Sequence, residues 1–209
     1  MLIVVITNDD LKADLMAQSQ EEKNEVIWKT DIDTINSDLR FDVCIDLLFE
    51  NTTERVNKLQ KLKTEMVLVN SVVQTLDKLP GFIRFNGWSS FLKRPIVEAT
   101  AKNGKMQTKA SAIFSLFNKK VEWVPDKPGF ITAKVIAMII NEAWFALEEE
   151  VSAKDEIDIA MKLGTNYPYG PFEWAEKIGL KNVYELLNHL SISNKRYKPS
   201  GLLQKEASK

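Results

Sequence analysis

The chain has 209 residues, and its 28 basic and 29 acidic side chains give a formal net charge of −1. It contains one cysteine, Cys44, and one histidine, His189. These counts exclude an internal disulfide and a metal site built from several thiolates or imidazoles, so we expect no metal cofactor. The chain also lacks the clusters of Lys and Arg on which phosphate binding depends, and we expect no nucleic-acid partner.

The start of the chain shows no membrane or export signal. Its apolar opening, residues 1–6, is far shorter than the roughly 20 residues of a membrane-spanning helix and lacks the layout of a secretory signal. We therefore expect a cytoplasmic protein with no membrane partner. Apolar residues make up 44% of the chain, which is enough for a packed core in one large domain or two small ones.

The first 79 residues contain neither glycine nor proline. Runs rich in Val and Ile predict strands at residues 2–7, 25–30, 41–49 and 65–72. The spacers between them are long enough for helices, as is typical of a parallel sheet buried on both faces. The clearest helix is at residues 51–64, where Val56, Leu59 and Leu62 share one face and Thr52 or Thr53 is the expected cap.

The pattern continues beyond this point. Further strands are predicted at residues 82–85, 96–99 and 121–124, and a helix at residues 107–118 lies between the last two. Repeated strand-helix-strand units indicate an α/β domain that covers residues 1–126.

The second half changes character at residues 126–129, Asp-Lys-Pro-Gly. Residues 130–151 lack glycine and proline and predict a long central helix. Its apolar positions follow a helical spacing: Ile136, Ile140, Trp144, Leu147 and Val151.

Shorter helices follow the central one. A capping-box-like start at Ser152 opens a helix over residues 152–163, which Gly164 is expected to end. Residues 172–178 and 183–190 predict two more helices, and a last turn is expected within residues 196–203. An all-α domain of this size, residues 127–209, is small for independent stability, so we expect its outer apolar face to pack on the first domain or on a second copy.

Strings of residues in this second half carry a resemblance. They are Asp126-Lys-Pro-Gly-Phe-Ile131, Asn141-Glu-Ala, Ala146-Leu-Glu-Glu, Asp158-Ile-Ala-Met-Lys-Leu-Gly164, Asn166-Tyr-Pro-Tyr-Gly-Pro-Phe-Glu-Trp174, Ile178-Gly-Leu180 and Arg196-Tyr-Lys-Pro-Ser-Gly-Leu-Leu203. Together they resemble the C-terminal helical domain of the 3-hydroxyacyl-CoA dehydrogenase family, which includes bacterial 3-hydroxybutyryl-CoA dehydrogenases. Upstream, residues 42–51 resemble the fourth strand of that family, and residues 81–98 resemble its catalytic strand-loop-strand segment.

The resemblance implies a reduced Rossmann-like domain at residues 1–126, which in the family binds NAD. It implies an all-α dimerisation domain at residues 127–209, which helps to hold a short-chain acyl-CoA. In the family, a histidine takes the proton from the 3-hydroxyl group of the substrate while the cofactor takes the hydride, and a glutamate orients that histidine. The reaction belongs to fatty acid and acyl-CoA metabolism.

The cofactor loop departs from the family pattern. A dinucleotide fold needs a G-x-G-x-x-G turn after its first strand, because only glycine lets the backbone approach the pyrophosphate. Here residues 7–11 read Thr-Asn-Asp-Asp-Leu, and we expect Asn8 or Asp9 to cap the following helix. Asp31, at the end of the second strand, and Glu50 are the candidate cofactor-binding residues, with a solvated loop acid as the alternative interpretation of Asp31.

The catalytic residues depart from the pattern as well. The alignment places Asn86 where the family has its histidine, and Glu98 matches the orienting glutamate. An amide cannot act as a general base near neutral pH. Ser71 is a candidate for contact with a substrate carbonyl, although a capping role is the simpler interpretation. Ala133 stands where the family has an asparagine that helps to hold the substrate.

Two hypotheses remain. The first is a divergent dehydrogenase with Glu98, Asn86 and Ser71 in an altered site and with NAD held in an unfamiliar way. The second is a pseudoenzyme that forms a homodimer through residues 130–203 and binds acyl-CoA or regulates an active dehydrogenase by forming mixed dimers. The missing glycine loop and histidine favour the second.

Overall fold

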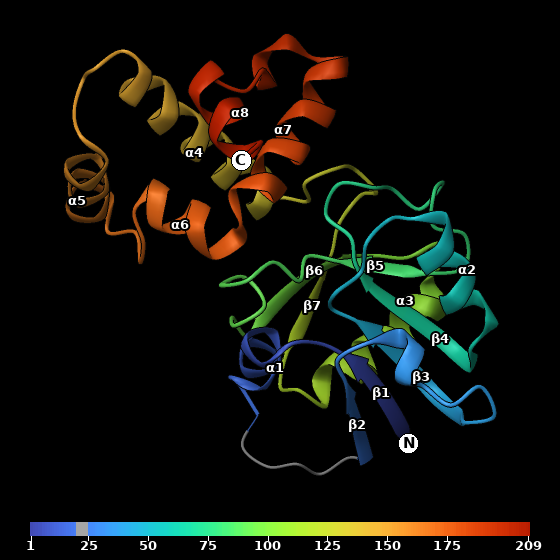
Figure 1. The fold of residues 1–209 in the computed structure, drawn as a ribbon. Coiled ribbons are helices and arrows are strands. Elements are labelled where there is room, and N and C mark those ends of the chain that lie inside the picture. The colour runs from blue at the N-terminus through green and yellow to red at the C-terminus, as the bar shows by residue number, and fades with distance from the viewer. Residues whose placement is uncertain (20–24) are drawn as a thin grey trace. The chain divides into compact units, whose positions relative to one another are not determined.

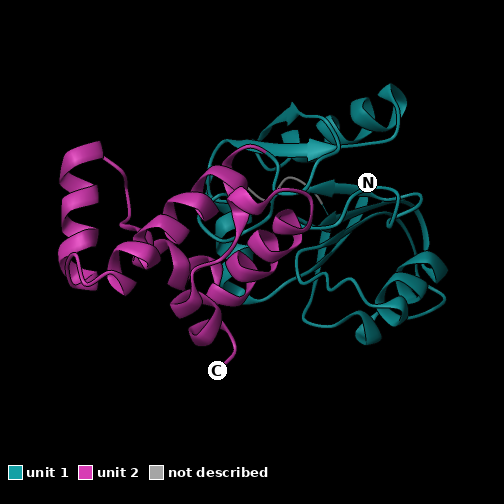
Figure 2. Ribbon diagram, turned by 90° about the horizontal axis from the view of Figure 1, so that it is seen from above, with its two compact units in different colours: residues 1–130 teal, residues 131–209 magenta. Residues whose placement is uncertain are grey.

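The structure is a computed structural model that describes residues 1–19 and 25–209. The chain divides into two compact units, Met1–Phe130 and Ile131–Lys209, which Figure 2 distinguishes by colour. The first unit ends four residues after residue 126, where the sequence predicts the end of the first domain.

The first unit contains a seven-stranded sheet in the described residues, with the order β2-β1-β3-β4-β5-β6-β7. Its strands are β1 (Leu2–Ile6), β2 (Glu25–Lys29), β3 (Arg40–Asp46), β4 (Lys63–Asn70), β5 (Ile83–Phe85), β6 (Ile96–Thr100) and β7 (Lys120–Trp123). Neighbouring strands are parallel except β5 and β6, which are antiparallel. The predicted α/β class with a mostly parallel sheet is confirmed (Figure 1).

Helices cover both faces of this sheet. The helices of the first unit are α1 (Asp9–Met16), α2 (Thr53–Lys61), α3 (Gly104–Ser115) and the short 3₁₀ helix η1 (Ile32–Thr34). Ile3 and Val5 of β1 pack in the cluster that α1 and α3 complete, whereas Val4 and Ile6 pack in the cluster of α2 and η1. Since successive strand residues point to opposite faces, burial on both faces explains the continuous apolar runs in the sequence.

Two limits differ from the predictions for local reasons. The strand predicted at residues 41–49 ends at Asp46, because the Asp46 carboxylate accepts a hydrogen bond from the Leu48 N–H (3.1 Å) and turns the chain. The helix predicted at residues 107–118 begins at Gly104, because the side chain of Asn103 caps it by accepting from the Met106 N–H (3.0 Å).

The second unit is helical. Its elements are α4 (Thr132–Glu148), α5 (Lys154–Thr165), α6 (Pro171–Ile178), α7 (Leu180–Ser193), η2 (Lys195–Tyr197) and α8 (Gly201–Ala207). The predicted all-α second domain is confirmed. Ile140 and Trp144 of the central helix α4 are buried inside the unit, and Trp144 packs edge-on against Phe172 of α6.

The predicted ends of α5 were wrong. Gly164 lies within the helix, and the chain leaves it at Asn166, which adopts a left-handed conformation with φ of 54°. At the other end the cap is Ala153, not Ser152, and the acid that folds back onto its N–H is Glu156 (3.3 Å). Glycine favours a helix end only where the backbone needs a positive φ, and here asparagine supplies it.

Buried polar side chains join the helices of the second unit. Asp158 of α5 accepts hydrogen bonds from the N–H groups of Phe172 (2.8 Å) and Glu173 (3.1 Å) at the start of α6. Asn141 of α4 donates to the Lys198 carbonyl (3.0 Å) and accepts from the Ser200 N–H (2.9 Å). Each polar group holds a chain segment that is far from it in sequence.

No helix within residues 1–19 and 25–209 combines the length and apolar character that crossing a membrane requires.

Candidate functional site at the carboxyl edge of the sheet

The candidate site lies where the order of strands reverses. The chain passes from β1 through α1 to β2 on one side, and β3 then pairs with β1 on the other side. In open α/β sheets, ligands bind in the crevice outside the carboxyl ends of the strands at such a point. Asp31 follows the carboxyl end of β2, and Glu50 lies just beyond β3, so both cofactor candidates lie at this edge.

The start of α1 does not fit a pyrophosphate group. Asn8 caps the helix, because its side-chain oxygen accepts a hydrogen bond from the Leu11 N–H (2.9 Å), as predicted. Asp9 and Asp10 occupy the exposed first turn. No residue in 6–11 has the positive φ of a glycine turn. The positive end of the helix dipole is thus already matched by carboxylates, which repel a phosphate.

A pocket of about 320 Å³ lies at the same edge of the first unit. It is lined by Thr30, Asp31, Ile32, Asp33, Leu48, Glu50, Thr52, Glu54, Arg55 and Lys58. Asp31 is exposed and caps η1 by accepting from the Asp33 N–H (2.9 Å), which fits the alternative interpretation of a solvated loop acid. Glu50 is also exposed. Acidic side chains outnumber basic ones in this lining, so its charge disfavours an anionic ligand.

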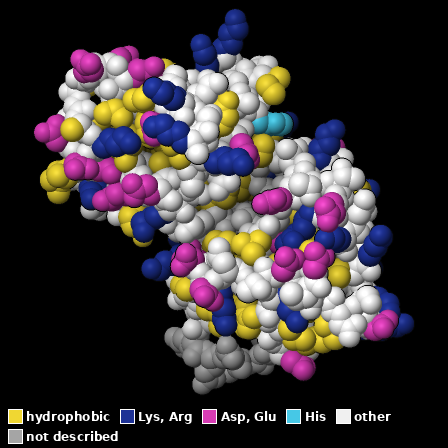
Figure 3. All heavy atoms as spheres, viewed as in Figure 1, with side chains coloured by type: hydrophobic (Ala, Val, Ile, Leu, Met, Phe, Trp, Pro, Cys, Tyr) yellow, Lys and Arg dark blue, Asp and Glu magenta, His cyan; other side chains and the backbone are white. Residues whose placement is uncertain are grey.

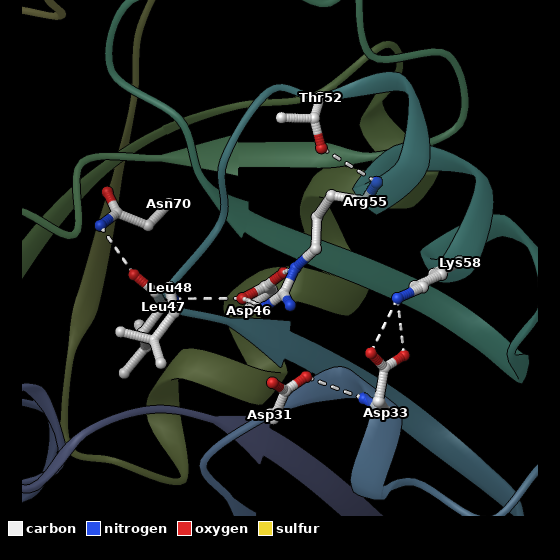
Figure 4. A network of polar contacts seen from close by, with 9 residues as sticks. All are labelled: Asp31, Asp33, Asp46, Leu47, Leu48, Thr52, Arg55, Lys58 and Asn70. Atoms are coloured by element: carbon white, nitrogen blue, oxygen red, sulfur yellow. Dashed lines mark hydrogen bonds and ion pairs between the residues drawn. The ribbon is translucent and has the colours of Figure 1, made fainter.

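An ion pair that the sequence did not reveal lies beside this pocket (Figure 4). The guanidinium group of Arg55 in α2 donates to both carboxylate oxygens of Asp46, from Nε to Oδ2 (2.8 Å) and from Nη2 to Oδ1 (2.8 Å). The Asp46 side chain is 0% exposed and the Arg55 side chain 16%. Burial raises the pKa of Asp46, and the hydrogen bonds and charge of Arg55 oppose that rise.

The predicted catalytic pair is in contact within the first unit. Asn86 follows β5 and Glu98 lies in β6, and both are buried. The Asn86 amide nitrogen donates to Glu98 Oε2 (3.3 Å), and the Asn86 side-chain oxygen accepts from the Trp88 N–H (3.4 Å). The structure therefore brings positions 86 and 98 into contact, with an amide at the position where the resemblance places the family's imidazole.

Asn70 and Gly87 hold the loop after β5. Asn70, the last residue of β4, donates to the Leu47 carbonyl (3.1 Å) and accepts from the Gly87 N–H (2.9 Å). A Cβ atom at Gly87 would lie 2.8 Å from the Asn70 side chain, so only glycine fits there. The loop that carries Asn86 is thus fixed to the ends of β3 and β4.

Ser71 lies next to a buried arginine that sequence reasoning missed. The Ser71 N–H donates to the Phe85 carbonyl (3.3 Å), and the Ser71 carbonyl accepts from Arg84 Nη1 (3.0 Å). Arg84 is 0% exposed, and its Nε donates to Asp126 Oδ1 (2.7 Å). Burial lowers the pKa of Arg84 despite Asp126. Arg84 is therefore a structural cation that holds the segment leading to the end of the first unit.

His189, the one histidine of the sequence, lies on α7 and is half-buried. Ala133, at the position where the family has a substrate-holding asparagine, is fully buried in α4.

Comparisons with known proteins identify the family. Residues 129–209 match the sequence profile described as 3-hydroxyacyl-CoA dehydrogenase, C-terminal domain. A 3-hydroxyadipyl-CoA dehydrogenase of Escherichia coli is 37% identical over 131 residues, which cover 56% of this chain and 28% of that protein. Residues 129–209 therefore correspond to the C-terminal domain of the 3-hydroxyacyl-CoA dehydrogenase family. The relatives that it matches include proteins named as 3-hydroxyadipyl-CoA dehydrogenase, probable 3-hydroxybutyryl-CoA dehydrogenase and hydroxyacyl-coenzyme A dehydrogenase.

Solved structures support the same assignment. A crystal structure of 3-hydroxybutyryl-CoA dehydrogenase from Escherichia coli is 31% identical, with a TM-score of 0.60 over 68% of this chain and 31% of that chain. The crystal structure of FadB2 from Mycobacterium tuberculosis has a TM-score of 0.78 over 99% of this chain and 93% of that chain, at 14% identity, and shows the common fold.

The chain matches only part of the length of its curated relatives. The matched segments cover 28% of the Escherichia coli 3-hydroxyadipyl-CoA dehydrogenase and 39% of a probable 3-hydroxybutyryl-CoA dehydrogenase of Bacillus subtilis, which is 31% identical to this chain over 112 residues.

Proposed function

We propose that this chain is a non-catalytic member of the 3-hydroxyacyl-CoA dehydrogenase family that acts by self-association through its helical unit. The observation that carries the proposal is the contact of Asn86 with Glu98. Oxidation at a 3-hydroxyl group needs a base that accepts a proton, and an amide has no lone pair basic enough for this role. Loss of a general base typically lowers a rate by about 10²–10⁴-fold.

The second support is the start of α1. The capped, acidic first turn leaves no place for a pyrophosphate, so a hydride acceptor or donor is not held next to Asn86 in the family's manner. A missing base and a missing cofactor site act on the same reaction, and their effects combine.

A second candidate is a divergent dehydrogenase that acts on a short-chain acyl-CoA through Glu98, Asn86 and Ser71. The retained contact between positions 86 and 98 favours it. An assay of NADH consumption with acetoacetyl-CoA separates the two candidates. We expect no consumption above a control without protein, for the natural chain and for Asn86→His alike, since a restored imidazole still lacks its cofactor. Turnover by the natural chain would refute the proposal.

The self-association surface that we propose is the outer face of α5. Ile159 and Leu163 lie one turn apart on this helix and are 52% and 82% exposed. Val151, just before the helix, is 69% exposed. Figure 3 shows apolar side chains open to solvent among charged ones on the second unit. Neighbouring exposed apolar residues on one helix face are typical of a surface that a partner covers.

The oligomer is tested by a matched pair of variants. Leu163→Glu places a charge on the proposed surface, and Ile192→Glu places one at an equally exposed position (82%) on α7. We expect light scattering after size-exclusion chromatography to give a dimer mass for the natural chain and Ile192→Glu, and a monomer mass for Leu163→Glu with unchanged circular dichroism. A dimer that survives Leu163→Glu would remove α5 from the interface.

A further inference from the structure

We infer that the Asp46–Arg55 ion pair occupies the carboxyl edge of the sheet, where a dinucleotide binds in cofactor-dependent members of this fold. The first unit is therefore stable without a ligand at that edge. The inference rests on the proposed function, because it assumes that no cofactor is used.

The position of the pair supports this. Asp46 is the last residue of β3 and is paired in register with Ile6, the last residue of β1. The Leu47 N–H, one residue further on, donates to the Ile6 carbonyl (2.9 Å). The Asp46 carboxylate thus lies at the reversal point of the strand order, where a ligand would bind.

Both carboxylate oxygens of Asp46 accept hydrogen bonds. Asp46 Oδ1 accepts from both Arg55 Nη2 and the Leu48 N–H, and Oδ2 accepts from Arg55 Nε. The backbone of Arg55 is fixed as well, because its backbone N–H donates to Thr52 Oγ1 (3.1 Å) at the start of α2. A bidentate arginine with a fixed backbone is held in one geometry, so its guanidinium group is not available to bind a phosphate.

The charges around the pair also disfavour binding of an anionic ligand. The other cation of the pocket, Lys58, is engaged by Asp33 (2.8 Å) and Glu54 (2.8 Å). Asp31 and Glu50 add two carboxylates to the lining. Asp46 cancels the charge of Arg55, so an incoming pyrophosphate meets no unmatched cation among the residues that line this pocket.

A double-mutant cycle tests the pair as an internal closure. Arg55→Leu leaves a buried carboxylate without its partner, and we expect the melting temperature to fall by about 10 °C. Asp46→Leu leaves the Arg55 guanidinium without its partner and should also lower the melting temperature. The double variant with Asp46→Leu and Arg55→Leu removes both charges, and we expect most of either loss to be recovered. Lys58→Leu breaks exposed ion pairs and serves as the control, with a shift of at most about 2 °C. Losses that simply add in the double variant would overturn the inference.

A ligand titration of the natural chain gives an independent readout if Arg55→Leu does not fold. We expect 1 mM NADH, NAD⁺ or ADP-ribose to shift the melting temperature by less than about 1 °C. A micromolar dissociation constant would raise it by several degrees and would overturn the inference. NADH turnover with acetoacetyl-CoA would refute the proposed function, whereas additive losses in the mutant cycle would refute only this inference.

Discussion

In the helical unit, the Asp158 carboxylate accepts two N–H groups at the start of α6, and in the sheet unit, the Asn86 amide contacts Glu98 where the family has a base. Both side chains are buried and hydrogen-bonded. The first stands in a motif that matches the family, and the second stands where the chain departs from it. The matching Asp158 holds two helices together, whereas Asn86 and the start of α1 depart from the family at positions that a reaction or a cofactor would need.

The comparison shows why recognition of the family and proof of an activity rest on different residues. A family motif whose residues cap helices is needed for folding whether or not any chemistry remains. A glycine loop or a catalytic histidine has no folding role to keep it in place. Resemblance in the helical unit therefore identifies the family without deciding the activity.

The largest expected effect is on the capping of α6. A Cβ atom at Gly170 would lie 2.3 Å from the Asp158 carboxyl carbon, so Gly170→Ala must displace the cap. We expect the free energy of unfolding to fall by about 3 kcal/mol in urea denaturation. Gly164→Ala, within α5 and with no atom in 4 Å of its new methyl group, is the control and should gain roughly 0.5–1 kcal/mol. Equal effects of the two substitutions would show that the cap is not rigid.

The next effect concerns Lys119 in the sheet unit. Its amino group donates to the carbonyls of Leu92 (2.5 Å) and Arg94 (3.1 Å) and so fixes the loop between β5 and β6. Burial lowers the pKa of Lys119 from 10.5 to about 8, although the nearby charge of Asp14 opposes this.

The sign of the pH dependence follows from that lowered pKa. Between pH 8 and 10.5 the unfolded chain keeps a proton that the folded chain has lost, so this group makes the free energy of unfolding rise with pH. The slope is at most about 1.4 kcal/mol per pH unit. Urea denaturation across this range should show the slope in the natural chain and a flatter profile in Lys119→Met. Parallel profiles would contradict the assignment.

The smallest effect concerns the first turn of α1. Because the Asn8 side chain caps the helix, Asn8→Ala should lower the free energy of unfolding by about 1 kcal/mol, and Asn8→Gly by only a few tenths. Urea denaturation of the two variants and the natural chain measures both differences. If Asn8→Gly instead brought NADH-dependent stabilisation, the loop would be a latent cofactor site rather than a cap.

The sheet and most helices could be predicted from the sequence because their signals are local. Strands such as β1 and β4 are buried on both faces and appear as apolar runs, and α2 shows its apolar stripe and its Thr52 cap. The position of Gly164 predicts a helix end that the structure places at Asn166, because the end depends on the left-handed backbone angle of Asn166 and the sequence does not specify that angle.

The polar contacts of the site could be predicted only in part. Asn86 and Glu98 were paired through a resemblance, and the structure brings them into contact. Arg84 binds Asp126, 42 residues away, and no sequence spacing reveals such a pair. Asp46 and Arg55 are only nine residues apart, and an acid at a strand end before an arginine in the next helix is a signal that could have been used.

The Asn141 contacts also bear on how fragments of this chain should be designed. The amide of Asn141 in α4 is satisfied by the Lys198 carbonyl and the Ser200 N–H, more than fifty positions later. A fragment cut before residue 198 would leave that buried amide without either partner and would remove Leu203, which is fully buried. Expression fragments and fusion junctions for the helical unit therefore belong beyond α8, and a cleavable tag there leaves the buried amide of Asn141 undisturbed.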